Sequence, residues 1–218
     1  MTYETIKNNE AIRTYISQAD ASLSALGYTE HSFAHVTRVA ENTGYILKTM
    51  GYPDRTVELG KIAGCLHDIG NLVNREEHSQ SGAVMAYRLL DKLGFDPSEI
   101  ALITTAIGNH DEGTGMPVND LAAALILADK SDVRRTRVRN DDFSTFDIHD
   151  RVNYSVVSSK LEINDAHTQI TLNLTVDTSI SPVMDYFEIF LDRMILCRKA
   201  AVQLKTTFKL IINGQHLI

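Results

Sequence analysis

The sequence predicts a mainly α-helical fold, a helical bundle with a small C-terminal α+β appendage. Over the first 152 residues, apolar residues recur with helical spacing, and glycine, proline and asparagine separate the segments. Beyond Asn153, apolar and polar residues alternate with a period of two in two short segments, which indicates strands. Helical spacing returns near Pro182. We therefore expect two units, residues 1–152 and residues 153–218.

Glycine and proline set the limits of the expected helices. Gly27 is the expected stop of the first helix, and Gly51-Tyr52-Pro53 ends the second. Pro97 suits the first turn of the fifth helix, and Asn119 or Asp120 lies near the cap of the sixth. The expected helices are Glu4–Leu26, Glu30–Met50, Pro53–Ile69, Ser79–Leu93, Pro97–His110 and one that begins near Val118.

The appendage is expected to contain an antiparallel hairpin, a helix and a final strand. Alternation through Leu161 and Ile163, and again over Ile170–Val176, predicts two strands. Residues Asn164–His167 between them have turn chemistry, so the two strands form a hairpin. A helix over Pro182–Lys205 and a strand over Phe208–Ile212 follow.

Composition is that of an ordinary globular protein, with 44% hydrophobic and 22% charged residues in 218. No basic segment followed by an apolar one opens the chain, so no secretory signal is expected. The longest apolar run, Leu121–Ala128, is too short to span a bilayer. Cys65 and Cys197 are isolated, as in buried free thiols of a reducing compartment. A cytoplasmic location is therefore expected.

The net charge of −7 argues against general binding to nucleic acid or to anionic membranes. One local exception is a cluster of four arginines, Arg134, Arg135, Arg137 and Arg139. The cluster predicts either an anion site or a solvated helix end whose cations complement the helix dipole. We favour the anion site, because the cluster begins five residues after a candidate metal ligand.

Histidines and aspartates on separate predicted helices form a candidate metal site. His67 precedes Asp68, and adjacent residues lie about 100° apart around a helix, so both can reach one ion or two neighbouring ions. Singly, each candidate has a packing explanation, such as a hydrogen-bonded core histidine or an aspartate at a solvated helix end. Together they exceed the four ligands of a tetrahedral zinc. The candidates are His35, His67, Asp68, His78, His110 and Asp129.

The order and spacing of these residues resemble the HD superfamily of metal-dependent phosphohydrolases. The shared pattern is His35 followed by Val39-Ala40, then the run His67–Gly70, then Asp129 within Ala128–Lys130. His78 and His110 resemble the further histidines of the two-metal subset. The resemblance covers roughly residues 30–139, about half of the chain. It implies an HD-type bundle with two divalent transition-metal ions, which would be iron, manganese or zinc.

The resemblance also implies the ligands of each metal. The first metal would be held by His35, His67, Asp68 and Asp129, and Asp68 would bridge to a second metal bound by His78 and His110. His31, one turn before His35, is the other candidate for the first ligand. We choose His35 because Val39-Ala40 follow it in the family's register, and expect His31 to bind substrate or orient the site.

Two such cations suit hydrolysis of a phosphate ester or anhydride by a metal-bridging hydroxide, with Asp68 as the central catalytic carboxylate. The phosphoryl oxygens need further cationic donors. Lys130 and Arg134 lie four residues apart on one expected helical stripe, and we assign both to catalysis and substrate binding. Arg135 is a further candidate for substrate binding. The alternative for Arg135 is a surface pair with Asp132.

Departures from the family limit the substrate. The segment His110–Pro117 resembles the HD-GYP cyclic-dinucleotide phosphodiesterases, but it has one histidine where they carry two, and Met116 replaces a tyrosine. Asn71 replaces a lysine that commonly follows the His-Asp-Ile-Gly run, which removes a phosphate donor. The spacing also resembles two-metal HD hydrolases of dinucleoside polyphosphates, but the final third of the chain has no motif that supports this substrate.

The expected function is hydrolysis of a small phosphorylated metabolite, with a nucleotide as first choice. An HD-type diiron oxygenase is the alternative, because its ligand set is the same. The identity and redox chemistry of the metal decide between hydrolysis and oxygenation. A third reading is a non-catalytic metal-binding sensor whose tail is an oligomerisation surface. Among partners we expect the substrate and a homo-oligomer formed through the C-terminal subdomain, and neither nucleic acid nor membrane.

Overall fold

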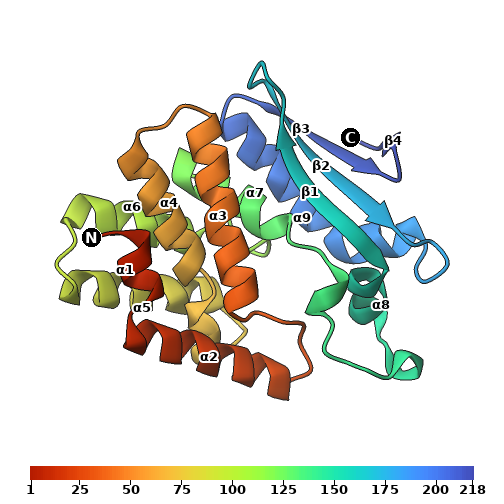
Figure 1. Cartoon of the computed structure of the whole chain (residues 1–218), viewed down its shortest axis with the longest axis horizontal. Helices are drawn as coiled ribbons and strands as arrows, with labels where there is room; N and C mark the ends of the chain where they lie inside the picture. The colour runs from red at the N-terminus through yellow and green to blue at the C-terminus, as the bar shows by residue number, and fades with distance from the viewer.

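The computed structural model describes residues 1–218 and has a helical bundle joined to a small four-stranded sheet (Figure 1). The expected fold class, mainly α with a C-terminal α+β appendage, is confirmed. The helices are α1 (Tyr3–Lys7), α2 (Glu10–Ala25), α3 (Phe33–Thr49), α4 (Asp54–Leu66), α5 (His78–Lys92), α6 (Pro97–Gly108), α7 (Asp120–Lys130), α8 (Ile148–Ser155) and α9 (Val183–Gln203). The strands are β1 (Val156–Ile163), β2 (Gln169–Val176), β3 (Thr207–Ile212) and β4 (Gln215–His216).

Helix α7 lies at the centre of the molecule. It packs against α3, α4, α6 and α9, and every residue from Leu121 to Ala128 is buried. A helix that is apolar on all sides is stable only when other elements surround it. Asp129 and Lys130, at its C-terminal end, are therefore carried into the interior rather than to solvent.

Helices α3 and α4 approach each other closely at Gly64. A Cβ atom on Gly64 would lie 2.6 Å from the Cα atom of Ala40, nearer than two such atoms can pack. The small residue thus allows the backbones to meet. This contact holds the end of α4, which carries His67, against the first turns of α3, which carries His35.

Two of the expected helices end differently in the structure. The first is split, because the Asn9 side chain accepts a hydrogen bond from the Ile12 amide (3.2 Å) and starts a new helix. The third stops at Leu66 instead of Ile69, and a 3₁₀ turn over Ile69–Leu72 follows. Asp68 therefore has non-helical backbone angles (φ −95°, ψ 3°), and at this residue the chain turns away from the axis of α4.

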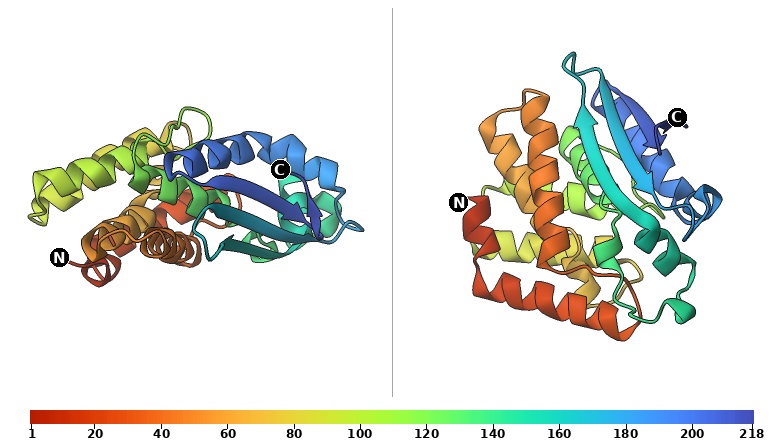
Figure 2. Two further views of the ribbon diagram at one scale, coloured as in Figure 1. Left: turned by 90° about the horizontal axis from the view of Figure 1, so that it is seen from above. Right: turned by 45° about the vertical axis from the view of Figure 1, so that its right-hand side comes forward.

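The sheet has the order β1-β2-β3-β4. The expected hairpin is present, with β1 antiparallel to β2 and Leu161 opposite Leu172. The final strand, β3, runs parallel to β2 and is reached through α9, which packs on the sheet (Figure 2). Parallel neighbours require such a crossover connection.

The appendage shares its interior with the bundle. One continuous cluster of 50 buried residues includes Leu125 of α7, Leu172 of β2 and Met194 of α9. The expected boundary between residues 152 and 153 falls inside α8, and the division into two units stays a prediction. No helix is both long enough and apolar enough to cross a membrane.

Candidate metal centre

The six candidate ligands come from five places along the chain and meet inside the bundle. His35 lies in the first turn of α3, His67 and Asp68 follow α4, and His78 begins α5. His110 follows α6, and Asp129 lies near the end of α7. All except Asp129 are buried, and the Asp129 side chain is only 11% exposed.

The first group of donor atoms comprises His35, His67, Asp68 and Asp129. The Nε2 atoms of His35 and His67 lie 3.2 Å apart. Oδ2 of Asp68 lies 3.4 Å from Nε2 of His35 and 3.2 Å from Nε2 of His67. Oδ1 of Asp129 lies 3.4 Å and 3.6 Å from the same two nitrogens. Such separations fit ligands around one cation, with each donor about 2.0–2.2 Å from it.

The second group lies on the other side of Asp68. Nε2 of His78 and Nε2 of His110 are 3.3 Å apart, and Oδ1 of Asp68 lies 3.4 Å and 3.9 Å from them. Oδ1 of Asp111 adds a carboxylate 3.9 Å from Nε2 of His78. The two oxygens of Asp68 thus face different groups of histidines.

The hydrogen bonds behind the rings fix which nitrogen faces the centre. The Nδ1 atoms of His67, His78 and His110 contact the carbonyl oxygens of Gly64 (2.8 Å), Arg75 (3.1 Å) and Ile107 (2.6 Å), respectively. A carbonyl oxygen only accepts, so each Nδ1 must donate, and the lone pair of each neutral ring is then on Nε2.

His35 follows the same pattern with a charged acceptor. Its Nδ1 donates to Oδ2 of Asp132 (2.8 Å), a carboxylate–histidine pair of the kind that orients metal ligands. Four imidazole lone pairs and two carboxylates therefore converge. This donor set fits one or two divalent transition-metal ions.

The carboxylates dominate the electrostatics of the first group. Burial opposes protonation of His67, but Asp68 and Asp129 outweigh it and raise the pKa of His67 to about 10. Burial alone would raise the pKa of Asp68, but charge on His67 and hydrogen bonds from His35 and His67 lower it well below its usual range. A proton and a metal cation thus compete for Nε2 of His67.

The second group favours neutral imidazole. Burial, and then the positive charges of His67 and Lys130, lower the pKa of His110 well below its usual range. Burial likewise lowers the pKa of His78. Neutral imidazole is the form that binds a metal ion.

A family model for the HD domain matches residues 32–134, the segment that supplies all six of these side chains. The chain contains an HD domain. An uncharacterized protein of Methanocaldococcus jannaschii is 26% identical to the chain over 161 residues, which are 64% of this chain and 62% of that protein. The match therefore spans about three-fifths of the length of that curated relative.

Among solved structures, this chain is similar to the crystal structure of a predicted HD superfamily hydrolase from an uncultured Thermotogales bacterium. The sequence identity is 27%, the TM-score is 0.44, and the match covers 57% of this chain and 67% of that one.

Asp132, just beyond the ligands of the HD domain, has a role that the sequence analysis missed. Besides His35, its carboxylate pairs with Arg38 (3.0 Å) and Arg134 (2.9 Å), and its side chain is 1% exposed. The alternative for Arg135, a surface pair with Asp132, is wrong, because Asp132 is buried and Arg135 contacts Tyr154 instead. The only sequence signal for a role of Asp132 beside the ligands was its position three residues after Asp129. That spacing does not place the two residues on one helix face, because α7 ends at Lys130.

The arginines of the basic cluster differ in their contacts. The shared helical stripe of Lys130 and Arg134 is wrong, because Arg134 has extended backbone angles (φ −161°, ψ 149°). Arg134 instead pairs with Glu30 (3.0 Å) as well as Asp132. Arg135 lies further out, where it donates to the carbonyl of Tyr154 (2.7 Å) and lies over that ring.

Lys130 is buried and belongs to a chain of ion pairs that reaches the partly exposed Glu112 and Arg193. Its Nζ atom lies 2.8 Å from Oδ2 of Asp129 and 2.5 Å from Oε2 of Glu112. Nε of Arg193, on α9, lies 2.8 Å from Oε1 of Glu112. The sequence analysis missed Glu112 and Arg193. The appendage thus contributes a cation to the surroundings of the HD-domain ligands.

His31 and Arg75 lie beside the two groups. The His31 ring lies 5.5 Å from that of His35, and its Nδ1 donates to the Thr29 carbonyl (2.7 Å). Nη1 of Arg75 lies 3.4 Å from Nε2 of His78. A depression of about 240 Å³ opens beside the second group and is lined by Arg75, Glu76, Glu77, His78, Ser79, Asp111, Gly113 and Thr114.

Proposed function

We propose that the protein is a metal-dependent phosphohydrolase with a dinuclear centre, acting on a small phosphorylated metabolite, with a nucleotide as the leading class. The HD domain supports hydrolysis in general. Two divalent ions bound about 3.5–4 Å apart would supply an activated water and neutralise charge on the phosphoryl oxygens. The Asp68 side chain carries the proposal of two ions.

Asp68 divides its two oxygens between the two groups. Oδ2 faces the His35 and His67 nitrogens, whereas Oδ1 faces those of His78 and His110. A carboxylate can bridge two cations with one oxygen for each, and this division would allow Asp68 to do so. A mononuclear site would leave His78 and His110 with converging lone pairs and no metal ion between them, with only Nη1 of Arg75, 3.4 Å from Nε2 of His78, as a nearby donor.

Arg75 is the cation best placed to bind a substrate phosphate at the second group. It is half-buried, lies at the rim of the depression beside His78, and is held by Asn71 (3.4 Å). A planar guanidinium matches the oxygens of a phosphate. The depression admits substrate from solvent, and the Nε2 atom of His31 remains available as an acceptor near the first group.

Lys130, Arg134 and Arg135 take different parts in the proposal. Lys130 pairs with Oδ2 of Asp129. The other oxygen of Asp129, Oδ1, is therefore directed at His35 and His67. Arg134 balances the charge of Asp132 and Glu30. Both therefore act by positioning ligands. Lys130, whose Nζ lies 2.8 Å from Oδ2 of Asp129, is in addition the candidate for contact with a bound phosphate. Arg135 is the farthest of the three.

The test is metal analysis of purified protein, followed by phosphate release from a panel of nucleotides and phosphoesters with iron, manganese or zinc loaded. We expect two ions per chain and phosphate release by the native protein. Replacing an outer partner of a ligand costs about 10–100-fold, so Asp68→Asn, which removes a ligand oxygen, should lower the rate by about 100-fold or more. It should also lower the metal content.

His149→Ala provides the matched control, because this histidine is exposed and lies on α8, which carries none of the candidate ligands. Its rate and metal content should match those of the native protein. Oxygen-dependent turnover without phosphate release would overturn the proposal in favour of a diiron oxygenase. Native metal content with no turnover of any substrate, in both native and Asp68→Asn protein, would favour a sensor.

A further inference from the structure

Helix α9 has an exposed apolar stripe on the side away from the bundle. Met184 is 73% exposed, Leu191 is 49% exposed and Val202 is 68% exposed, and Ile195 lies between the last two. At about 100° per residue, all four lie within about 20° of one line along the helix, opposite to the inward-facing Arg193. Figure 2 shows α9 along one face of the sheet, at the periphery of the molecule.

The stripe is symmetric along its length. Met184 and Val202 are nine residues on either side of position 193, and Leu191 and Ile195 are two residues on either side. Glu188 and Arg198 are five residues on either side, and their charges are opposite. Both are exposed, and neither forms a salt bridge within its own chain.

We propose that this face of α9 pairs with α9 of a second copy of the chain, antiparallel about a two-fold axis at position 193. The axis would bring Leu191 against Ile195 of the second copy, and Met184 against its Val202. It would also bring Glu188 against Arg198, twice in the dimer. A two-fold interface must be self-complementary, and the apolar, acidic and basic positions all satisfy this requirement.

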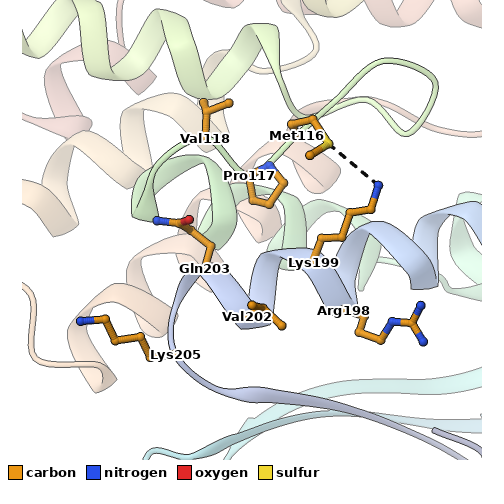
Figure 3. A pocket seen from close by; sticks show the side chains of 8 residues that line it. All are labelled: Met116, Pro117, Val118, Arg198, Lys199, Val202, Gln203 and Lys205. Atoms are coloured by element: carbon orange, nitrogen blue, oxygen red, sulfur yellow. Dashed lines mark hydrogen bonds between the residues drawn. The ribbon is translucent and has the colours of Figure 1, made fainter.

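A hollow at one end of the stripe accommodates a side chain from the second copy. About 660 Å³ in volume, it lies between α9 and the segment Met116–Val118, next to Val202 (Figure 3). Met116 and Val118 are 48% and 53% exposed and, with Val202, give the hollow an apolar part, whereas Arg198, Lys199, Gln203 and Lys205 make up the rest of its lining. The two-fold axis would direct Met184 of the second copy to this place, and the unbranched methionine side chain suits an irregular gap.

The first test is the mass of the assembly by sedimentation over a range of concentrations. The native protein should sediment at twice the chain mass of 24.3 kDa. Leu191→Asp should sediment as a monomer with unchanged circular dichroism and metal content. The matched control is Leu102→Asp, which changes an exposed leucine on α6 and should remain dimeric. A native protein that is monomeric at about 100 µM, the upper end of the range, would overturn the proposal.

Charge reversal tests the pairing of Glu188 with Arg198. Glu188→Arg and Arg198→Glu each place like charges together twice, so each should raise the dimer dissociation constant by about tenfold. The double variant restores opposite charges and should return close to the native value. If the double variant dissociated as readily as the single variants, this register would be wrong.

Cysteine cross-linking tests the antiparallel direction. A mixture of Glu188→Cys protein and Arg198→Cys protein should form a disulfide-linked heterodimer on mild oxidation, whereas each protein alone should form little. The native cysteines, Cys65 and Cys197, are buried and do not compete. Self-linking of Glu188→Cys in preference to the mixture indicates parallel helices and contradicts the proposal.

Discussion

Asp132 lies behind His35, on the side away from the other ligands, and orients that ring through Nδ1. Arg38 and Arg134 fix the carboxylate in turn. An outer partner of this kind keeps the correct nitrogen unprotonated and the ring in one orientation. In the proposed centre, the position of the first metal would thus depend on a residue that does not touch it.

We predict that Asp132→Asn lowers the affinity of the first metal by about 10–100-fold. The amide preserves the size of the side chain but removes the charge that supports His35. Competition with a fluorescent chelator measures the affinity of the loaded ion. Asp141→Asn, at an exposed position, is the control and should bind as the native protein does. Equal affinities for both variants would contradict the role of Asp132.

The candidate ligands could be predicted from short motifs in the sequence. The residues that hold these ligands in place could not be predicted. His67-Asp68 and Asp129 have recognisable neighbours in the sequence, and the structure brings all six candidates together. Arg193 pairs with Glu112 across 81 residues, and nothing local to either residue indicates the other. Arg134 was misjudged because the helix that would have aligned it with Lys130 ends first.

At the scale of elements, the 3₁₀ turn after α4 packs against the first turns of α5. A Cβ atom on Gly70 would overlap the carbonyl oxygen of His78 and would lie 2.6 Å from the hydroxyl oxygen of Ser81, and both contacts are steric clashes. Only glycine allows this contact. It places Asp68, at the start of the turn, beside His78, at the start of α5.

We predict that Gly70→Ala separates the turn from α5 and weakens the second group more than the first. The variant should lose about 1–3 kcal/mol of stability, as is typical when a side chain is forced into a packed contact. Thermal unfolding and metal content measure the two effects. Gly108→Ala is the control, because its Cβ would meet the nearest atom, of Ala83, at an ordinary 3.5 Å. If Gly70→Ala kept both ions and native stability, the packing argument would fail.

Periodicity and caps account for what could be predicted of the elements. Gly27 and Gly51 both have positive φ at helix ends, as their positions in the sequence suggested. The order of the strands could not be predicted, because the place of β3 beside β2 depends on how α9 packs over the sheet. Such long-range packing leaves no periodic signal in either strand.

For the whole molecule, metal and proton binding should both affect stability. Without metal, a protonated His67 offsets the buried charges of Asp68 and Asp129. Because its pKa is raised from 6.5 to about 10, this stabilisation is fully present below pH 6.5 and is lost as the pH rises toward 10. In the proposed centre, a bound metal would take the place of that proton.

We therefore predict that chelation lowers the unfolding temperature, and that the difference between loaded and chelated protein grows as the pH rises from 6 to 9. A difference of about 1 kcal/mol corresponds to about 2–4 °C in a chain of this size. Scanning calorimetry of both forms at each pH provides the measurement. A difference that shrank toward alkaline pH would have the wrong sign for competition between metal and proton at His67.

The ion pair between Arg193 and Glu112 matters for any attempt to transfer the helical bundle of this chain, without the appendage, into another protein. Severing the polypeptide after the last bundle helix would leave Glu112 balanced by a single cation and uncover the flank of α7 that α9 protects. If the ligand-bearing helices were transplanted alone, Glu112 would keep Lys130 but lose Arg193. A transplanted bundle would therefore need another helix in place of α9.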